Sequence, residues 1–540
     1  MTDTTPRPAG AFAPLRHRLF AVIWVATVLG NVGSFMRDVA SAWLVLDLSS
    51  SPSAVALVQA AATLPVFLLA IPAGVLSDIV NRRRMLILIQ IGLACVSTAL
   101  LLVALTGTAS VASLAALTFL GGVGAALAAP VWQSIVPELV PRPALKGAVA
   151  LNSLGFNISR AIGPALGGVL LAGFGAAATY GADVASYMVV IAALLWWKRA
   201  PDPRDELSEH FTGALRAGLR FARASRDLHR VLLIGGLFFA CASAVWALLP
   251  IVAGRLLGGG PGFYGLALGA VGAGAIGGAV VLPRVRGRFG PGGVLAGAAV
   301  VTAAVLAVLA LVPPLWAALV VLLLLGMAWI AVLTTLNATT QAILPDWVRG
   351  RGLALYLTMF NGAMTAGSLA WGAVAEAVGV PATLLTAAAG LLAVGLVARG
   401  MALPLGEDDL TPANHWPEPV VAPPLAGDRH QDLHDRGPVL ITVEYRIAAA
   451  DRAAFAATLP HLAEQRRRDG AYAWGISEDA ADPERLLEWF FVESWAEHLR
   501  QHRRVSRADA DLQTAQRALH QGPEPPVVAH FLALNPTRKG

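Results

Sequence analysis

The feature that most restricts how this chain can fold is a succession of apolar runs about as long as a bilayer is thick. Residues 55–77 and 85–105 are two examples. A helix of about 20 apolar residues crosses the hydrocarbon core, and a soluble protein of 540 residues is not 56% hydrophobic and 14% charged. The sequence therefore predicts an all-α polytopic membrane protein. Twelve spans are expected, at residues 18–47, 54–77, 85–106, 110–136, 145–174, 178–197, 230–256, 262–283, 293–312, 315–344, 352–377 and 381–400.

The first run follows several arginines and resembles a secretory leader, but we interpret it as the first span. It is about thirty residues long and contains Arg37 and Asp38, whereas a leader has a shorter, uncharged apolar region. The two cysteines, Cys95 and Cys241, both fall inside predicted spans. They indicate neither a disulfide framework nor a metal site, and we expect no metal and no cofactor.

The basic residues between the spans predict the orientation. Counted together with the adjoining span ends, the loops after the odd-numbered spans contain one, Arg255, whereas the N-terminal segment and the loops after the even-numbered spans contain 21. Basic loops stay on the cytoplasmic side, so we expect both termini in the cytoplasm and the protein in the inner (plasma) membrane. The same asymmetry explains the net charge of +6 without a nucleic-acid partner; the expected partner is the lipid bilayer.

Two polar segments divide the chain. Residues 199–229 separate the spans six and six, giving helical bundles at 1–198 and 230–402. The bundles repeat weakly, because Gly74 and Arg82 align with Gly278 and Arg286 at an offset of 204. Duplicated six-helix halves are typical of transporters that rock about a site near the bilayer midplane. Residues 403–437 are rich in proline and acidic side chains and are expected to form a disordered linker.

Residues 438–535 are expected to form a soluble α+β domain. Their pattern of period-2 and helical segments reads β-α-β-β-α-β, with residues 495–520 as one long polar helix. That order predicts a ferredoxin-like sheet, which we interpret as a regulatory or self-associating module. Catalysis or ligand binding there is the less favoured interpretation, and its candidate residues are His498, His502, Trp474, Trp489 and Trp495.

The turn GVLSDIVNRRRML at 74–86 resembles the loop signature of the major facilitator superfamily. Gly74, Asp78 and the arginines Arg82, Arg83 and Arg84 match it, while Ile79 and Asn81 replace the usual basic residue and turn glycine. Asparagine tolerates the left-handed conformation better than most residues, so we expect the turn to be retained. The resemblance implies two pseudo-symmetric six-helix bundles.

The stretch NISRAIGPALGGVL at 157–170 resembles the span-five motif of proton-coupled exporters, through Gly163, Pro164, Gly167 and Gly168. Together with VPELVPRPALKGAVALNS it is similar to the enterobactin-exporter and macrolide-efflux branch, the transmembrane secretion effectors. The tail resembles antibiotic-biosynthesis-monooxygenase-like domains. The resemblance implies export of a small molecule; the residues themselves predict close helix packing around these glycines and a bend at the proline.

Charged residues inside the spans are the main candidates for a substrate or proton pathway, because each costs several kcal/mol in the bilayer. They are Arg37, Asp38, Arg160 and Asp183. Neighbouring helix positions point about 100° apart, so Arg37 and Asp38 are not expected to form a simple facing pair. One or both are expected to have partners on another helix; Arg160 and Asp183 are the candidates, and Arg160 with Asp38 would be a compensated pair. Asp38 is favoured over Asp183 as the proton-binding carboxylate, since Asp183 is expected near the outer surface.

The basic turn is also a candidate cytoplasmic gate. Asp78 can cap a neighbouring helix, where a carboxylate meets the positive end of the helix dipole. Arg82 or Arg84 can pair with Glu138 at the end of span four. We expect this cluster, with Gly74, to latch the outward-facing state.

The leading hypothesis is a non-enzymatic secondary transporter that exports a small amphipathic molecule, such as a siderophore or macrolide, in exchange for protons. No Walker motif for ATP occurs. Two alternatives stay open: a lysophospholipid translocator, and a membrane anchor for a sensory or enzymatic tail. Aromatic residues could line a hydrophobic pocket, although packing is the favoured interpretation for each of Trp132, Trp246, Trp329, Phe156 and Phe360.

Overall fold

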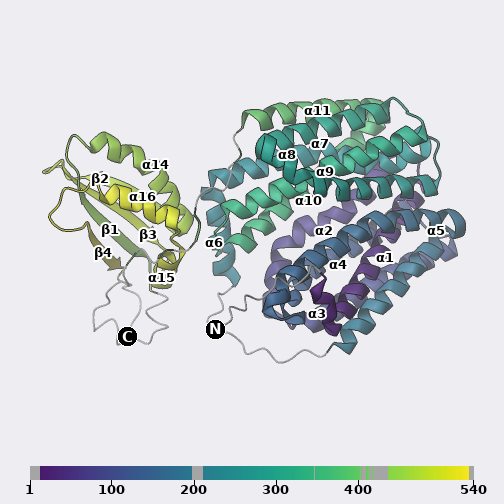
Figure 1. Cartoon of the computed structure of the whole chain (residues 1–540), viewed down its shortest axis with the longest axis horizontal. Coiled ribbons are helices and arrows are strands. Elements are labelled where there is room, and N and C mark those ends of the chain that lie inside the picture. Colours follow the sequence, from purple (N-terminus) through teal and green to yellow (C-terminus); the bar gives the residue numbers. More distant parts are fainter. Residues whose placement is uncertain are drawn as a thin grey trace, which may run out of the picture. The chain divides into compact units, whose positions relative to one another are not determined.

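The computed structural model describes residues 12–197, 211–345, 347–401, 403, 409–411, 413, 416 and 436–533 (Figure 1). It divides into two compact units. The first contains the long apolar helices. The second contains residues 404–540 together with two segments between the long helices, 206–231 and 339–353. The two units are described separately.

The first half of the helical unit begins with the short 3-10 helix η1 (Ala13–Arg16) and α1 (Arg18–Leu48). Ser51 caps α2, Asn81 caps α3 and Ser110 caps α4, each by accepting a backbone N–H. Asn81 has φ −60°, so it serves as a helix cap and not, as expected, as a left-handed turn residue. The elements are α2 (Pro52–Ile79), α3 (Arg82–Thr106), α4 (Val111–Leu139), η2 (Arg142–Ala144) and α5 (Leu145–Trp196).

The second half repeats this arrangement with long, bent helices. Its elements are α7 (Arg226–Ile251), a π-helical turn η3 (Val252–Leu256), α8 (Pro261–Ala310), α9 (Leu315–Ile343), α10 (Arg349–Val378) and α11 (Val380–Gly400). Two helices contain a sharp bend at a glycine with positive φ, Gly175 in α5 (φ 80°) and Gly290 in α8 (φ 65°). Only glycine takes that conformation without steric cost, so each long helix is two straight segments joined at a hinge.

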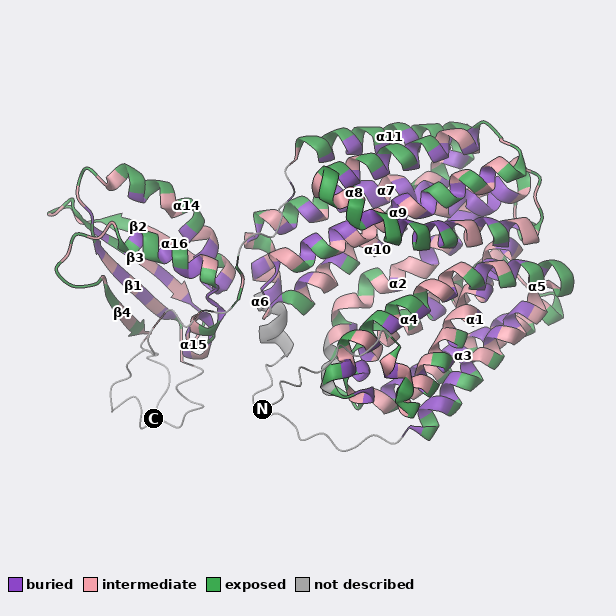
Figure 2. Ribbon diagram, viewed as in Figure 1, coloured by how far each residue is buried: buried purple, intermediate pink, exposed green. Residues whose placement is uncertain are grey.

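Among the described residues, nine helices are long and apolar enough to cross a membrane. These are α1, α2 to Gly74, α3, α4, α5, α7 extended through η3, α8, α9 and α11. Their most apolar windows differ in burial, from 22% of residues in α4 to 61% in α7, and Figure 2 shows α7 largely buried. Apolar surface that is not buried suits a lipid environment, and the chain is a multi-pass membrane protein.

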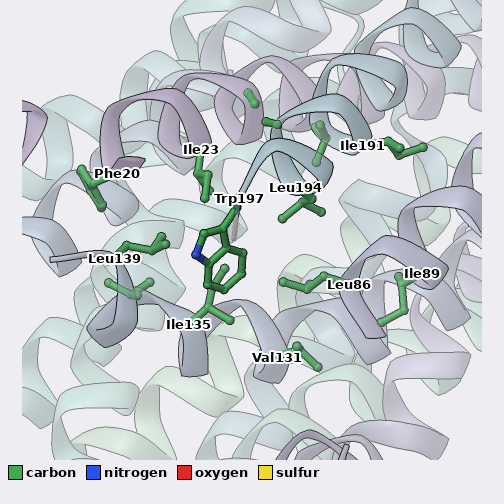
Figure 3. Packing of buried hydrophobic residues seen from close by; sticks show 14 of the residues in the cluster. Phe20, Ile23, Leu86, Ile89, Val131, Ile135, Leu139, Ile191, Leu194 and Trp197 are labelled. Carbon is green, nitrogen blue, oxygen red and sulfur yellow. The ribbon is translucent and has the colours of Figure 1, made fainter. Parts of the chain in front are cut away.

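A hydrophobic core joins α1, α3, α4 and α5 near the arginine-rich turn. Trp197, which is 2% exposed, follows the last residue of α5, and its indole lies among side chains of all four helices (Figure 3). The core also includes Phe20, Ile23, Leu86, Ile89, Val131, Ile135, Leu139, Ile191 and Leu194. Packing of this kind fixes the positions of the four helices that carry the charged residues described below.

The second unit is built on a four-stranded antiparallel sheet in the order β2-β3-β1-β4. Its strands are β1 (Val439–Arg446), β2 (Ala473–Glu478), β3 (Arg485–Val492) and β4 (Val527–Leu532). The helices are α14 (Arg452–Asp469), α15 (Trp495–Arg504) and α16 (Arg507–Arg517), and α14 and α16 lie side by side over the sheet (Figure 1). The unit also contains α6 (Phe211–Ala224).

One expectation for the tail was wrong, and another can be compared with the structure only in part. The single helix expected over 495–520 is two helices, because Val505 is non-helical and Ser506 with Asp509 forms a capping box that starts α16. Most of the linker expected at 403–437 lies outside the described residues. Its described part is bonded to the module: Trp416 Nε1 donates to Gln513 Oε1 at 2.6 Å, and Arg507 N donates to Thr411 O at 3.0 Å.

Candidate functional site

Three charged side chains meet where α1 faces the second segment of α5. The Arg37 guanidinium lies between two carboxylates, with Nη2 3.0 Å from Asp38 Oδ1 and Nη1 3.6 Å from Asp183 Oδ2. Their exposures differ: 0% for the side chain of Asp183, 13% for Arg37 and 55% for Asp38. One cation is thus shared by a fully buried carboxylate and an open one.

Hydroxyl groups complete this cluster. Ser97 Oγ donates to Asp183 Oδ2 at 2.6 Å, and Arg37 Nη1 donates to the Tyr187 hydroxyl at 2.9 Å. Ser34 Oγ lies 3.0 Å from the same hydroxyl. A buried carboxylate needs such partners to offset the loss of water. The cluster is therefore a hydrogen-bonded network across α1, α3 and α5.

A glycine lets the helices come close enough for this network. A Cβ built on Gly33 of α1 would lie 2.2 Å from Ser186 Oγ and 2.8 Å from Asp183 Oδ1. Any side chain there would push α5 away from α1. Tyr187, Ser97 and Gly33 were not identified from the sequence, because an isolated tyrosine, serine or glycine in a span has no distinguishing pattern.

Three sequence expectations about the charges were wrong. Arg37 does pair with Asp38, because the long arginine side chain bends back along the helix and reaches a neighbour that a short side chain would miss. Asp183 is fully buried and not relieved by outer-surface water. Arg160 makes no ion pair within the described residues. Its guanidinium lies 5.8 Å from the centre of the Trp246 ring in α7.

Trp246 belongs to an aromatic cluster in the second half of the helical unit. Trp329 is 5.1 Å from Trp246 and 5.5 Å from Phe239, and Phe360 is 4.6 Å from Phe239, centre to centre. These rings come from α7, α9 and α10. Trp132 instead packs against the core around Trp197, as favoured from the sequence, and Phe156 contacts Phe35 at 5.7 Å.

The glycine motif of α5 lies at two close helix contacts. A Cβ on Gly163 would meet Phe35, and one on Gly167 would lie 2.8 Å from Met36 Cα, so these two positions face α1. A Cβ on Gly168 would lie 2.7 Å from Gly265 Cα, so this position faces α8. Pro164 follows Gly163 within the helix. The motif brings α5 against one helix of each half.

The arginines of the basic turn have different partners. Arg82 Nη1 lies 2.9 Å from Glu138 Oε1, which is the pair expected from the sequence. Arg83 donates to the carbonyls of Leu194 and Leu195 at the end of α5, where a cation meets the negative helix end. Arg84 is exposed. Gly74 is half-buried at the end of α2, and the side chain of Asp78 lies outside the described residues.

At the opposite end of the helices, two residues of the second half hold the turn between α1 and α2. The Arg255 guanidinium donates to the carbonyls of Leu46, Ser49 and Ser50, each at 2.8 Å. Glu376 Oε2 accepts from Ser51 Oγ at 2.6 Å and from Ser53 N at 3.3 Å. We call Arg255 and Glu376 the α1–α2 turn clamp. Further along, Thr63 Oγ1 lies 2.7 Å from Thr365 Oγ1.

In the second unit, the predicted tail residues fall into three groups. Trp495 and His498 pack together with a ring distance of 5.4 Å, and His502 lies beside His498. Burial lowers the pKa of His498 to about 3, so its imidazole is neutral. Trp474 instead donates to the buried Glu488. Trp489 alternates to the other side of β3 and bonds to Ser477, so it shares no pocket with the others.

The tail module contacts two segments from between the long helices. Arg220 of α6 donates to Glu497 Oε1 at 2.8 Å, and the Arg504 guanidinium lies 4.3 Å from the Trp347 ring centre. Phe221 and Trp347 meet edge to face at 5.8 Å. These contacts unite α6, the segment around Trp347 and α15 in one unit.

Comparison with known proteins gives consistent matches. The family model described as transmembrane secretion effector matches residues 9–538. The multidrug efflux pump Tap of Mycolicibacterium fortuitum is 26% identical over 411 residues, covering 71% of this chain and 95% of Tap. The enterobactin exporter EntS of Shigella boydii is 33% identical over 180 residues, covering 33% of this chain and 43% of EntS.

The fold is also that of solved transporters. A mutant of the nucleoside transporter NupG superposes with a TM-score of 0.61 at 11% identity, and the match covers 71% of this chain and 99% of NupG. At this identity the likeness shows the fold alone. The family model, in contrast, spans nearly the whole sequence, and the chain belongs to the transmembrane secretion effector family of the major facilitator superfamily.

Proposed function

We propose that this transporter exports a small amphipathic molecule, of the kind represented by siderophores and macrolides, and that inward proton movement drives export. The observation that carries the proposal is Arg37 held between buried Asp183 and exposed Asp38. The names of Tap and EntS, a multidrug efflux pump and an enterobactin exporter, support the direction and the substrate class.

The proposed topology has twelve crossings in the plasma membrane with both termini in the cytoplasm. Counting the two segments of α5 and of α8 separately turns nine candidate spans into eleven, and α10 adds the twelfth. The arginine-rich turn then lies on the cytoplasmic side, as the distribution of basic residues favours. The α1–α2 turn and its clamp lie outside.

Asp38 is the proposed proton-binding group. Its side chain is 55% exposed although it is twenty residues into α1, and a charge at that depth cannot face hydrocarbon cheaply. We infer that it faces a water-filled path between the halves. Asp183 is the proposed fixed counter-charge. Protonation of Asp38 leaves Arg37 with Asp183 alone, which changes the charge on the path by one unit.

Trp246 and Phe360, the half-buried rings of the aromatic cluster, are the proposed hydrophobic side of the substrate path, and the buried rings of Phe239 and Trp329 support them from behind. Arg160 of the first half lies against Trp246 of the second, so the path has contributions from both halves. Arginine and tryptophan together suit an amphipathic molecule with an aromatic or anionic group.

The described arrangement corresponds, we infer, to a state closed on the outside. The clamp, the Thr63–Thr365 contact and the Gly168–Gly265 contact all join the two halves on the side of the α1–α2 turn. Alternating access requires these contacts to separate when the opposite side closes. The turn cluster of Gly74, Asp78, Arg82, Arg84 and Glu138 is the proposed cytoplasmic gate. Its Arg82–Glu138 pair is already formed in this arrangement and joins α3 to α4 within the first half, so contact with the second half is expected from other residues of the turn when that side closes.

Loosening the clamp is expected to favour the outward-open state. The double variant Arg255→Gln, Glu376→Gln removes the charge-assisted hydrogen bonds that hold the α1–α2 turn to the second half. We expect a cysteine placed at Thr63, with Cys95 and Cys241 replaced by serine, to react at least roughly tenfold faster with an impermeant maleimide added outside. Ser110→Ala is the matched control, because Ser110 caps α4 within the first half alone. An unchanged labelling rate would contradict the role of the clamp.

For the tail we propose a ferredoxin-like domain at 438–535 that regulates transport and self-associates. Its contacts with α6 and the segment around Trp347 support a regulatory position. Removal of residues 405–540 tests this against the alternative of an anchored sensory or enzymatic tail. Retained export by the truncated protein makes the tail accessory. The alternative is favoured if the truncated protein no longer exports and if a ligand binds the full-length chain but not the truncated one.

The export proposal itself is tested in inside-out vesicles that contain the purified protein and a pH-sensitive dye. The candidate substrates are a siderophore, a macrolide and a lysophospholipid, added one at a time. We expect one of these classes to collapse an imposed proton gradient. A response to the lysophospholipid alone would favour the lipid-translocator alternative. Substrate uptake that is unaffected by the gradient would defeat the proton coupling.

A further inference from the structure

Three histidines of the tail module come together from two distant parts of the sequence. His498 and His502 lie four residues apart on α15, and His530 lies on β4. One ring nitrogen from each lies within 4.8 Å of the corresponding nitrogen of the other two. His498 Nε2 and His502 Nε2 are 3.2 Å apart, and the ring centres of His498 and His530 are 4.6 Å apart.

The nitrogens of His498 and His502 have the spacing of two ligands around one metal ion, and the nitrogen of His530, within 4.8 Å, has to move closer to join them. Zinc binds imidazole nitrogen at about 2.0–2.1 Å in tetrahedral geometry, which puts two ligand nitrogens about 3.3–3.4 Å apart. Histidines at i and i+4 share one helix face, a known arrangement for a zinc pair. The alternative for two imidazole nitrogens 3.2 Å apart is one N–H···N hydrogen bond, but that accounts for two rings and not for the third.

The surroundings also suit a metal site. Trp495 packs against both His498 and His530, at ring distances of 5.4 and 5.9 Å, and Trp416 packs against His502 at 4.8 Å. Such an apolar shell restrains the orientation of the ligand rings. Arg466, a buried cation whose charge acts on His498, is paired with Glu488 at 2.8 Å, so its charge is balanced locally.

A candidate acceptor for the other ring nitrogen of His498 lies on the same helix. Within the described residues, His498 Nδ1 makes no hydrogen bond of standard geometry although it is buried, and neither does the carboxamide of Gln501 one turn later. The two side chains lie against each other. A metal-bound histidine donates its other N–H to an oxygen acceptor, and a small movement would let Gln501 Oε1 accept it.

We propose that His498, His502 and His530 bind one Zn²⁺ ion in the tail module. Three protein ligands leave the fourth position to water or to an exchangeable donor group. His498 is 1% exposed while His502 and His530 are half-buried, so the open position faces outward past these two. The proposal does not depend on the transport activity of the helical unit.

The test uses the full-length protein in detergent, with its purification tag removed, after treatment with a chelator. Titration with Zn²⁺ against a colorimetric zinc indicator is expected to give one tight site per chain. His502→Gln and His530→Gln are each expected to weaken zinc binding more than about 100-fold. Loss of a residue that only hydrogen-bonds to a metal ligand already lowers metal affinity by about 10–100-fold. Co²⁺ in the same site is expected to give the intense visible bands of tetrahedral coordination.

His461→Gln is the matched control, because His461 is an exposed histidine of the same module. It should leave the affinity unchanged. His498→Gln removes a buried group and can unfold the module, so the decision rests on the two half-buried histidines. Absence of a saturable site in the wild-type protein, or equal affinity in His502→Gln, His530→Gln and wild type, would overturn the proposal.

Discussion

Replacement of Asp183 by asparagine is expected to abolish coupled transport and to lower the amount of folded protein. Asparagine has the same size and can still accept from Ser97, but it removes one of the two charges that balance Arg37. Loss of a partner from a buried ion pair costs about 3–5 kcal/mol. Substrate-driven proton movement in vesicles is therefore expected to fall by roughly 100-fold or more per molecule of total protein.

Two further variants separate charge balance from coupling. Combining Arg37→Gln with Asp183→Asn is expected to restore the amount of folded protein, because the cation that had lost its buried counter-charge is removed as well, but not coupled transport. Asp38→Asn is expected to fold normally and to move substrate without protons. Asp47→Asn, an exposed carboxylate later in the same helix, is the control. Wild-type coupling in both Asp183→Asn and Asp38→Asn would refute the proposed roles.

The long apolar runs and the basic turns allowed much of the helical unit to be predicted. A twenty-residue apolar segment has few alternatives to a membrane helix, so α1, α3 and α9 begin and end within a few residues of the predicted limits. Arg82 and Glu138 were paired correctly because both lie at helix ends that a short turn and a repeated motif place near each other.

Asp183 is one of the two candidate partners that the sequence offers for the charges of α1, but the pairing of Arg37 with both Asp38 and Asp183 could not be predicted in the same way. Which residue a buried arginine reaches depends on the rotation of each helix about its axis, and a run of alanine, valine and leucine fixes that rotation only weakly. Gly33 sets the distance between α1 and α5, but its role is visible only when Ser186 and Asp183 face it. The clamp was missed for a related reason, since Arg255 and Glu376 are each an isolated charge near a helix end.

The histidine cluster shows the same limit in the tail. The spacing HLRQH was visible in α15, but a pair of histidines on a charged helix is usually solvated. Only the sheet order, with β4 next to β1, brings His530 to the same face. That contact joins residues about thirty positions apart, and no local pattern records it.

Replacement of Glu488 by glutamine is expected to destabilise the tail module by about 3–5 kcal/mol. Glu488 is fully buried on β3 and accepts from Arg466 Nε at 2.8 Å, from Trp474 Nε1 at 3.0 Å and from the Tyr445 hydroxyl at 3.1 Å. Glutamine keeps the size but leaves the Arg466 guanidinium, itself 5% exposed, without an anion. It also brings an amide N–H₂ to a site where every neighbour is a donor.

Hydrogen exchange of the full-length protein measures this effect, because the amides of β1 and β3 exchange only when the sheet opens. A loss of 3 kcal/mol raises their exchange rate by roughly 100-fold. Glu444→Gln is the control: Glu444 lies on the neighbouring strand β1 and pairs with Arg485, but both side chains are exposed and solvent screens the pair. Its variant should exchange nearly as slowly as wild type. Equal exchange in the two variants would mean that Arg466 finds another counter-charge, and that the buried pair does not hold the sheet together.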